Sequence, residues 1–357
     1  MKRLAVLTSG GDAQGMNAAV RSVVRTALAM DAEIYGIERG YAGLLDEDIT
    51  PMTSASVGGI VLRGGTMLRT ARCQAFFERK NQIQAADILR KHGIDGLVVI
   101  GGDGSVQGAE VLTHLGIPTV TVPGTIDNDM HGTDETIGHD TAVNVVVSAV
   151  SRIRDSASAH ERAAIVEVMG RFAGHIALDA GLACGAEYVL VPEVPFERET
   201  LARSLEAQMK LGRTNSIIIC AEGAGDARSL GEWLKEHTKI DVCTTTLGFI
   251  QRGGQPTARD CQLGSVLGAC AVTALLRGET GVLIGMHRGR VRILPYEEAK
   301  KEKEPFRRDL YDLAVMLGAT GMECSPINDA PLRIPPALFH TASALSAPSG
   351  HLPIGKR

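Results

Sequence analysis

The stretch that decides the fold reads Gly96-Leu97-Val98-Val99-Ile100-Gly101-Gly102-Asp103-Gly104-Ser105. An apolar run of about five residues, rich in Val and Ile, is typical of a strand buried on both faces of a parallel sheet. The glycine-rich turn that follows leads into an amphipathic, helix-like pattern. The segment therefore predicts a strand, a turn and a helix in immediate succession.

The same pattern recurs along the chain. Apolar runs that end in glycine-containing turns occupy Leu4–Leu7, Thr119–Val122, Ala164–Val168 and Ser216–Cys220. Repetition of strand, turn and helix predicts an α/β architecture with functional loops at the carboxyl ends of the strands. One set of turns precedes residue 130 and a second lies between about 160 and 255. We therefore expect two similar three-layer α/β domains with largely parallel sheets facing a shared active-site cleft.

Bulk composition limits the class of protein. The chain has 357 residues, of which 44% are hydrophobic and 22% charged, as expected for two packed globular domains. A net charge of −4 argues against a nucleic-acid-binding surface. No run approaches the roughly 18 apolar residues of a membrane span. The seven cysteines form no Cys-x-x-Cys pair, which favours reduced thiols and predicts a cytoplasmic protein.

Two glycine-rich turns are candidates for phosphate binding. The first, Thr8–Asn17, is not a Walker loop because Gly15 is followed by Met16, and a strand-to-helix turn without a ligand is an equal alternative. The second contains Asp103, a carboxylate among small residues that can hold Mg²⁺ near phosphate. An aspartate that caps the next helix is the alternative for this second turn.

The segment Pro123-Gly124-Thr125-Ile126-Asp127-Asn128-Asp129 carries the most chemical information. Of two carboxylates separated by one residue, one can act as a base and the other can associate with a metal ion, and phosphoryl transfer requires both roles. A polar Asx turn would explain the Asp and Asn content but not the whole segment. Four arginines lie near glycine turns or loop signals: Arg72, Arg162, Arg171 and Arg252. An arginine side chain can bind a phosphate through two hydrogen bonds.

Together these segments resemble bacterial ATP-dependent 6-phosphofructokinases over about residues 2–320. The resemblance implies that Asp127 is the base that activates the 1-hydroxyl of fructose 6-phosphate. It implies that the other catalytic residues are Arg72, Thr125, Arg171 and Gly11. It implies cofactor-binding residues Gly11, Arg72, Cys73, Gly102, Asp103, Gly104 and Ser105, with Asp103 on Mg²⁺. It implies substrate-binding residues Thr125, Ile126, Asp127, Arg162, Met169, Gly170, Arg171, Glu222 and Arg252.

The resemblance also implies the donor, the assembly and the domain boundaries. Glycine at Gly104 and Gly124, where pyrophosphate-using relatives carry Asp and Lys, favours ATP. A homotetramer whose active sites are completed at subunit contacts is expected, with no nucleic-acid or membrane partner. We expect an ATP-binding larger domain of residues 1–138 plus 251–305 and a sugar-phosphate-binding smaller domain of residues 139–250 plus 306–320. Residues 321–357, with six prolines, are expected to form an irregular tail.

Two positions depart from the family pattern. Cys243 and Phe249 stand where the family usually has an Arg and a His that hold the sugar's 6-phosphate. Loss of two such hydrogen bonds would weaken binding by roughly 10²–10⁴-fold. Three alternatives stay open. The local sequence has drifted and other residues compensate for the lost contacts; or the acceptor has changed to another sugar phosphate, an unphosphorylated sugar or a nucleoside; or the chain is a non-catalytic regulatory subunit. An NAD or lipid kinase, which can share the Gly-Gly-Asp-Gly motif, is disfavoured by Pro123–Asp129 and by Met169-Gly170-Arg171.

Only some of the residues that form the family's allosteric site have a match in this chain. Its matching residues here are Arg21, Arg25, Arg154, Glu187 and Arg213, the last in place of a lysine. Ser54 and Leu211 stand where the family often has basic residues. Arg21 and Arg25 are also spaced for one solvated helix face. We expect regulation by ADP or phosphoenolpyruvate to be weak or altered.

Overall fold

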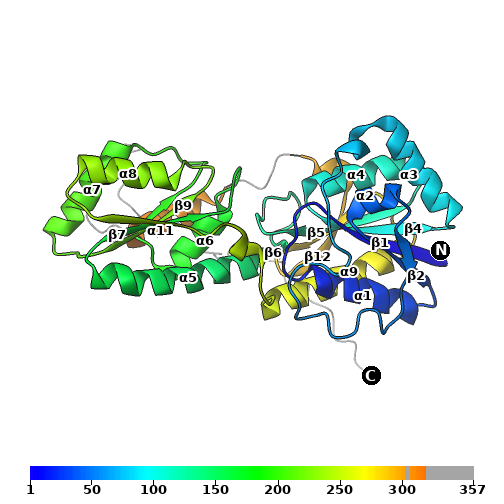
Figure 1. Cartoon of the computed structure of the whole chain (residues 1–357). Helices are drawn as coiled ribbons and strands as arrows, with labels where there is room; N and C mark the ends of the chain where they lie inside the picture. Colours follow the sequence, from blue (N-terminus) through cyan, green and yellow to red (C-terminus); the bar gives the residue numbers. More distant parts are fainter. Residues whose placement is uncertain (302–305, 319–357) are drawn as a thin grey trace, which may run out of the picture.

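The computed structural model describes residues 1–301 and 306–318, which form two lobes, each built around a β-sheet (Figure 1). The larger sheet has eight strands. In spatial order they are β12 (Arg290–Pro295), β11 (Val282–His287), β5 (Thr119–Thr125), β4 (Gly96–Gly101), β1 (Arg3–Ser9), β2 (Glu33–Ile37) and β3 (Ile49–Pro51), with β6 (Ile137–Gly138) paired to β5. All pairings are parallel except β11–β12 and β2–β3 at the two edges. The predicted, largely parallel sheet is confirmed.

The smaller sheet is wholly parallel within the described residues. Its order is β10 (Val242–Thr246), β7 (Ala163–Val168), β9 (Ser216–Ala221) and β8 (Tyr188–Leu190). All five apolar runs that predicted strands lie inside strands of the two sheets. These runs are mostly apolar because helices cover both faces of each sheet, so neither face needs a regular row of polar side chains.

The helices complete a three-layer arrangement in each lobe. On the larger sheet, α1 (Met16–Ala29) and α9 (Ala258–Leu276) cover one face, and α2 (Gly40–Leu45), α3 (Arg79–Lys91) and α4 (Asp103–His114) cover the other (Figure 1). On the smaller sheet, α5 (His139–Ala159), α6 (His175–Cys184) and α11 (Arg308–Gly318) lie on one face, with α7 (Arg198–Lys210) and α8 (Ala227–His237) opposite. The remaining short elements are η1 (Gln74–Phe77), η2 (Gly248–Arg252) and α10 (Tyr296–Ala299).

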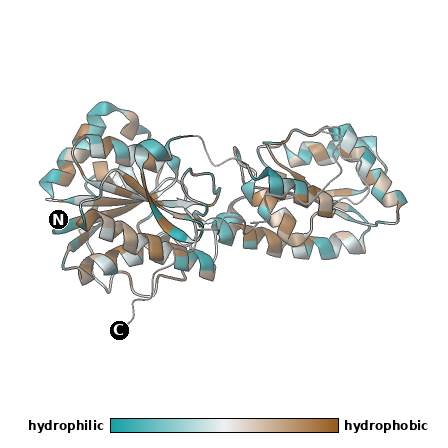
Figure 2. Ribbon diagram, turned by 180° about the vertical axis from the view of Figure 1, so that it is seen from behind, coloured by the Kyte–Doolittle hydropathy of each residue, from teal (hydrophilic) through white to brown (hydrophobic). Residues whose placement is uncertain are grey.

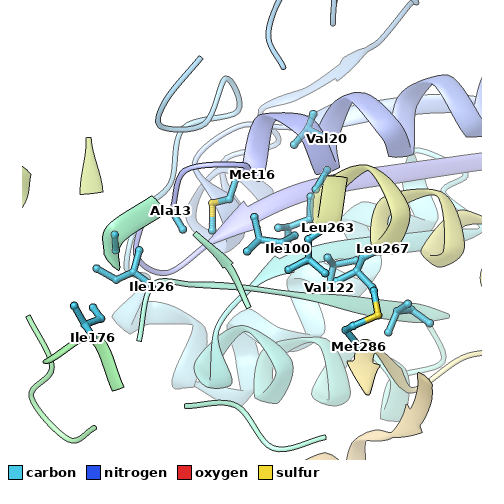
Figure 3. Close-up of a cluster of buried hydrophobic side chains, with 14 of the residues drawn as sticks. Ala13, Met16, Val20, Ile100, Val122, Ile126, Ile176, Leu263, Leu267 and Met286 are labelled. Atoms are coloured by element: carbon cyan, nitrogen blue, oxygen red, sulfur yellow. The ribbon is translucent and has the colours of Figure 1, made fainter. Parts of the chain in front are cut away.

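One hydrophobic core runs through both lobes. It extends from α1 and α9 along the larger sheet to Ile126, then to Ile176 of α6 on the smaller one (Figure 3). Helices α1 and α9 approach very closely, because a Cβ on Gly268 would lie 2.7 Å from the Ala19 carbonyl oxygen. Figure 2 shows the result as apolar strands between helices whose outward faces are hydrophilic.

The strand membership is compatible with the predicted domain boundaries at residues 138, 250 and 305. Those boundaries stay a prediction, and the expected proline-containing tail, 321–357, lies outside the described residues. No helix within residues 1–301 and 306–318 is long and apolar enough to cross a membrane.

Candidate functional site

A cavity of about 460 Å³ lies at the carboxyl ends of β1, β4 and β5. This is the edge where a parallel α/β sheet places its binding loops, and the volume suits a small ligand. Ten of the predicted site residues line it: Gly11, Arg72, Cys73, Gly102, Asp103, Gly104, Ser105, Thr125, Asp127 and Arg252. The structure therefore brings together loops that are far apart in sequence, such as those of Gly11 and Arg252.

Arg252 joins two distant segments of the chain at this cavity. From η2 it donates from Nη1 to the Asp12 carbonyl oxygen at 2.8 Å, and a Cβ on Gly11 would lie 2.8 Å from the same Nη1. Gln14, which is fully buried, donates from Nε2 to the carbonyl oxygens of Gln251 (2.9 Å) and Gly253 (2.8 Å). These contacts fix a guanidinium beside the glycine loop that follows β1.

Asp127 lies half-buried just after β5, at the wall of the cavity. Its backbone N–H donates to the Thr125 hydroxyl at 3.2 Å. Burial and the negative charge of Asp129 raise the pKa of Asp127, although the positive charge of Arg252 acts in the opposite direction. A carboxylate with a raised pKa is a better proton acceptor near neutral pH than an ordinary one.

The carboxylates at the cavity suit a magnesium ion that is shared with a phosphate ligand. Asp103 is in the first turn of α4, whose N-cap residue is Gly102, so the alternative of Asp103 as the N-cap is wrong. Asp103, Asp127 and Asp129 all line the same cavity. Across the described part of the chain, no three His, Cys, Asp or Glu side chains are grouped closely enough to hold a metal by themselves. Mg²⁺ commonly takes one or two carboxylates and completes its shell with phosphate oxygens and water, so these residues fit it.

The aromatic wall of the cavity escaped the sequence analysis. The rings of Tyr41 and Phe76 stack with centroids 4.3 Å apart, and the Tyr41 hydroxyl donates to the Ser105 carbonyl oxygen at 2.7 Å. Gly108 on α4 packs against that ring, because a Cβ there would lie 2.6 Å from it. Tyr41 belongs to no motif and is far from Phe76 in sequence, so only the fold pairs them.

Six predicted site residues do not line the cavity. Ile126 is fully buried in the core. Met169, Gly170, Arg171 and Glu222 follow the carboxyl ends of β7 and β9, on the side of the smaller lobe. Among them, the negative charge of Glu222 raises the pKa of Asp127. The guanidinium carbon of Arg171 lies 5.2 Å from the centre of the Phe172 ring.

Arg162 is the sixth of these residues and lies at the amino end of β7, so the length of that strand separates it from Met169. Its Nε is 3.2 Å from Asp241 Oδ2. Within one chain it is therefore not brought to the cavity.

The predicted allosteric residues fall into two groups. Arg154 and Arg213 each approach Glu187 Oε1 at 3.4 Å, and the other Glu187 oxygen accepts the Ile217 N–H at 2.7 Å. Arg21 and Arg25 instead lie on α1, which covers the larger sheet. The role of these residues stays a prediction.

Comparison with known proteins identifies the family. The family model for phosphofructokinase matches residues 3–275, most of the chain. The chain belongs to the phosphofructokinase family. Among curated members, a protein of Paenibacillus macquariensis named ATP-dependent 6-phosphofructokinase is 51% identical over 318 residues, covering 89% of this chain and 99% of that protein. A protein of the same name from Clostridioides difficile is 49% identical over 317 residues, with the same coverage.

Solved structures of phosphofructokinases share this fold. A phosphofructokinase from Saccharomyces cerevisiae superposes with a TM-score of 0.80 at 36% identity, covering 89% of this chain and 47% of that one, so this chain spans about half its length. A pyrophosphate-dependent phosphofructokinase from Marinobacter aquaeolei gives a TM-score of 0.79 at 21% identity, covering 92% of this chain and 94% of that one. At that identity the likeness shows the fold alone.

Proposed function

We propose that this protein is an ATP-dependent 6-phosphofructokinase, which transfers the γ-phosphoryl group of ATP to the 1-hydroxyl of fructose 6-phosphate. The observation that carries the proposal is the single cavity lined by two glycine-rich loops, by Asp127 and by the guanidinium groups of Arg72 and Arg252. A base beside phosphate-binding loops and cations is the set of groups that phosphoryl transfer needs. The names of the curated relatives agree with it.

In the proposed reaction Asp127 accepts the proton of the attacking sugar hydroxyl. Its raised pKa suits that role. Arg72 and Arg252, with the backbone N–H of Gly11 and the Thr125 hydroxyl, offset the negative charge on the phosphoryl group as it moves between the two oxygens. Because these groups come from separate rigid elements, the reactants are held in line before the reaction begins.

Asp103 is the proposed magnesium ligand, and Mg²⁺ when bound neutralises charge on the phosphate oxygens. The nature of the donor is supported by Gly104. A Cβ at that position would meet nothing within 4 Å, and Gly104 lines the cavity. An aspartate there would extend a negative charge into the space that the nucleotide phosphates need, whereas glycine leaves it open.

The acceptor side of the site is where this chain departs from the family pattern. Cys243 of β10 packs against the hydrophobic core, and Phe249 of η2 is 82% exposed. Neither side chain can replace a cation at a phosphate. A panel with ATP and fructose 6-phosphate, tagatose 6-phosphate, sedoheptulose 7-phosphate and unphosphorylated sugars tests the acceptor. Highest kcat/KM with fructose 6-phosphate supports the proposal, a clear preference for another acceptor assigns a changed specificity, and no turnover with any acceptor assigns a regulatory subunit.

Replacement of the base tests the mechanism. Asp127→Ser should lower kcat by about 10²–10⁴-fold, because proton transfer by a positioned group contributes that much, while the Kd for ATP changes little. Asp87→Asn is the matched control, since Asp87 is an exposed carboxylate paired with Arg90 at 2.7 Å on α3. Nearly intact turnover in Asp127→Ser would show that another group is the base.

We also propose that the enzyme is a cytoplasmic homotetramer. Support for the assembly comes from Arg162, which lies at the far end of β7 from Met169 and could reach a sugar phosphate only in a second copy. Light scattering of the purified chain should give four times the monomer mass of 37.8 kDa. The proposed weak response to ADP or phosphoenolpyruvate is checked by titration, and strong ordinary activation by ADP would contradict it.

A further inference from the structure

His139 lies directly behind the loop that carries Asp127. It is the first residue of α5 and is 9% exposed. Its Nδ1 is 2.7 Å from the carbonyl oxygen of Ile126, the residue before Asp127, and its Nε2 is 2.9 Å from Oδ2 of Asp179 on α6. A single imidazole therefore links the end of the larger sheet to a helix of the smaller lobe.

Both partners of this imidazole are hydrogen-bond acceptors. A backbone carbonyl has no proton to donate, and neither has a carboxylate. A neutral imidazole carries one N–H, whereas an imidazolium carries two. The two short contacts can therefore both be hydrogen bonds only when His139 is protonated.

The surrounding charges favour that protonated form. Burial opposes the charge, but the hydrogen bond and negative charge of Asp179, with a smaller contribution from Asp260, raise the pKa of His139 above its ordinary value. Burial and the charge on His139 lower the pKa of its neighbour His175 on α6, so the pKa values of the two imidazoles shift in opposite directions. Other charged residues around the start of α5 are Asp127 and Asp129 on the loop, Asp140 on α5 itself, Arg252 on η2 and Glu193 between β8 and α7.

The start of α5 is held from the opposite side as well. The buried carboxylate of Asp260 on α9 accepts the backbone N–H groups of Gly138 and Thr141, each at 2.8 Å. The backbone at the start of α5 is therefore held to α9, and the buried His139 ring contacts an acceptor at each nitrogen. The position of the Ile126 carbonyl then determines where the adjacent Asp127 backbone lies.

We propose that His139 is a positioning residue for phosphoryl transfer, and that its imidazolium, bonded at once to the Ile126 carbonyl and to Asp179, holds the Asp127 loop in its reactive geometry. The inference rests on the proposed kinase activity, and it adds that the position of the Asp127 loop depends on pH. Loss of the His139 proton removes one of the two bonds and frees the loop from α6. Activity should therefore fall at alkaline pH for a reason separate from the ionisation of Asp127, which acts on the acid side.

Asp179→Asn is the decisive variant. The Asp179 side chain is 39% exposed, so the change is tolerated, and an amide oxygen still accepts a hydrogen bond from Nε2. An opposite charge at this range moves a pKa by about 1–3 units, each worth tenfold in the protonated fraction. We expect kcat/KM for fructose 6-phosphate to lie much closer to the wild-type value at pH 6.5 than at pH 8.5, where it should be at least about tenfold lower, with KM for ATP unchanged.

His139→Gln provides an independent readout. Glutamine can donate toward only one partner and does not titrate, so kcat should be lower throughout and the alkaline fall should disappear. Glu47→Gln is the matched control, because Glu47 forms an exposed pair with His92 at 3.1 Å on the far side of the larger lobe. Its pH profile should superimpose on that of the wild type. Thermal melts at both pH values check that each variant is folded.

The outcomes separate the two proposals. A wild-type chain without fructose 6-phosphate turnover overturns the proposed function. An active wild type whose pH profile is unchanged, or uniformly scaled, in Asp179→Asn overturns the role of the protonated His139. Retention of an ordinary alkaline fall in His139→Gln overturns it as well.

Discussion

Adding a single methyl group at Gly108 should disturb nucleotide binding through the Tyr41 ring. A Cβ at this position of α4 would lie 2.6 Å from two ring carbons, whereas ordinary contacts begin at 3.4 Å, so the ring must retreat by about 0.8 Å. The ring has little freedom to do so, because it is 4% exposed, stacks on Phe76 and is tied by its hydroxyl to the Ser105 carbonyl. Both aromatic rings line the cavity, so the movement changes the shape of the site.

The magnitude follows from two opposing effects in Gly108→Ala. Overpacking of this kind costs about 1–3 kcal/mol, and alanine in a helix interior regains about 1 kcal/mol over glycine. We expect the free energy of unfolding to fall by about 1 kcal/mol in urea denaturation. We expect KM for ATP to rise about tenfold, equivalent to about 1.4 kcal/mol, with KM for fructose 6-phosphate unchanged.

A double-mutant cycle tests the cause. Tyr41→Leu removes the atoms that the new methyl group meets, so Gly108→Ala should have a smaller effect on KM for ATP in that background. Steady-state kinetics at saturating sugar phosphate give the KM for ATP of the wild type, the two single variants and the double variant. Equal effects of Gly108→Ala in both backgrounds would refute the contact with the ring. An unchanged KM for ATP in the single variant would refute the prediction that nucleotide binding depends on the Tyr41 ring.

Three further predictions follow from other parts of the structure. Arg252→Gln removes a positive charge that lowers the pKa of Asp127, so the acid limb of the kcat/KM profile should move to higher pH; an unmoved limb would disprove that coupling. Asp260→Ala leaves two backbone N–H groups and a threonine hydroxyl at the start of α5 without their acceptor. It should lower the free energy of unfolding by about 3 kcal/mol in urea, and a loss below about 1 kcal/mol would contradict this. Burial and nearby negative charges raise the pKa of Cys220 to about 12, so mass spectrometry should find it unalkylated by iodoacetamide at pH 8 until the chain is unfolded.

Much of the fold was predictable because its signals are local. Runs of Val and Ile such as Leu97–Ile100 identify buried parallel strands, and the glycine turns after them mark the edge of the sheet where ligands bind. The cavity residues Gly11, Asp103 and Asp127 were predicted from motifs in which side-chain chemistry and backbone shape occur within a few positions. Such motifs require no knowledge of how distant segments meet.

The residues that support the site were not predictable in the same way. Tyr41 and Phe76 form the aromatic wall, and Arg252 reaches the loop after β1, only because the fold brings their elements to one edge of the sheet. The pair of His139 and Asp179 carries no motif, since one residue begins α5 and the other lies 40 positions later on α6. Arg162 was expected at the substrate, and in one chain it lies at the other end of β7.

The sequence by itself determined the order of strands and turns and the family resemblance, and it led to the prediction that Asp127 is the base. These depend on apolar patterning and on short-range chemistry, which the chain carries within each segment. The tertiary structure decided that the pKa values of Asp127 and His139 are raised and that Arg252 lies close to the glycine loop. Those properties depend on burial and on distances between charges from different elements, and such distances exist only once the chain has folded.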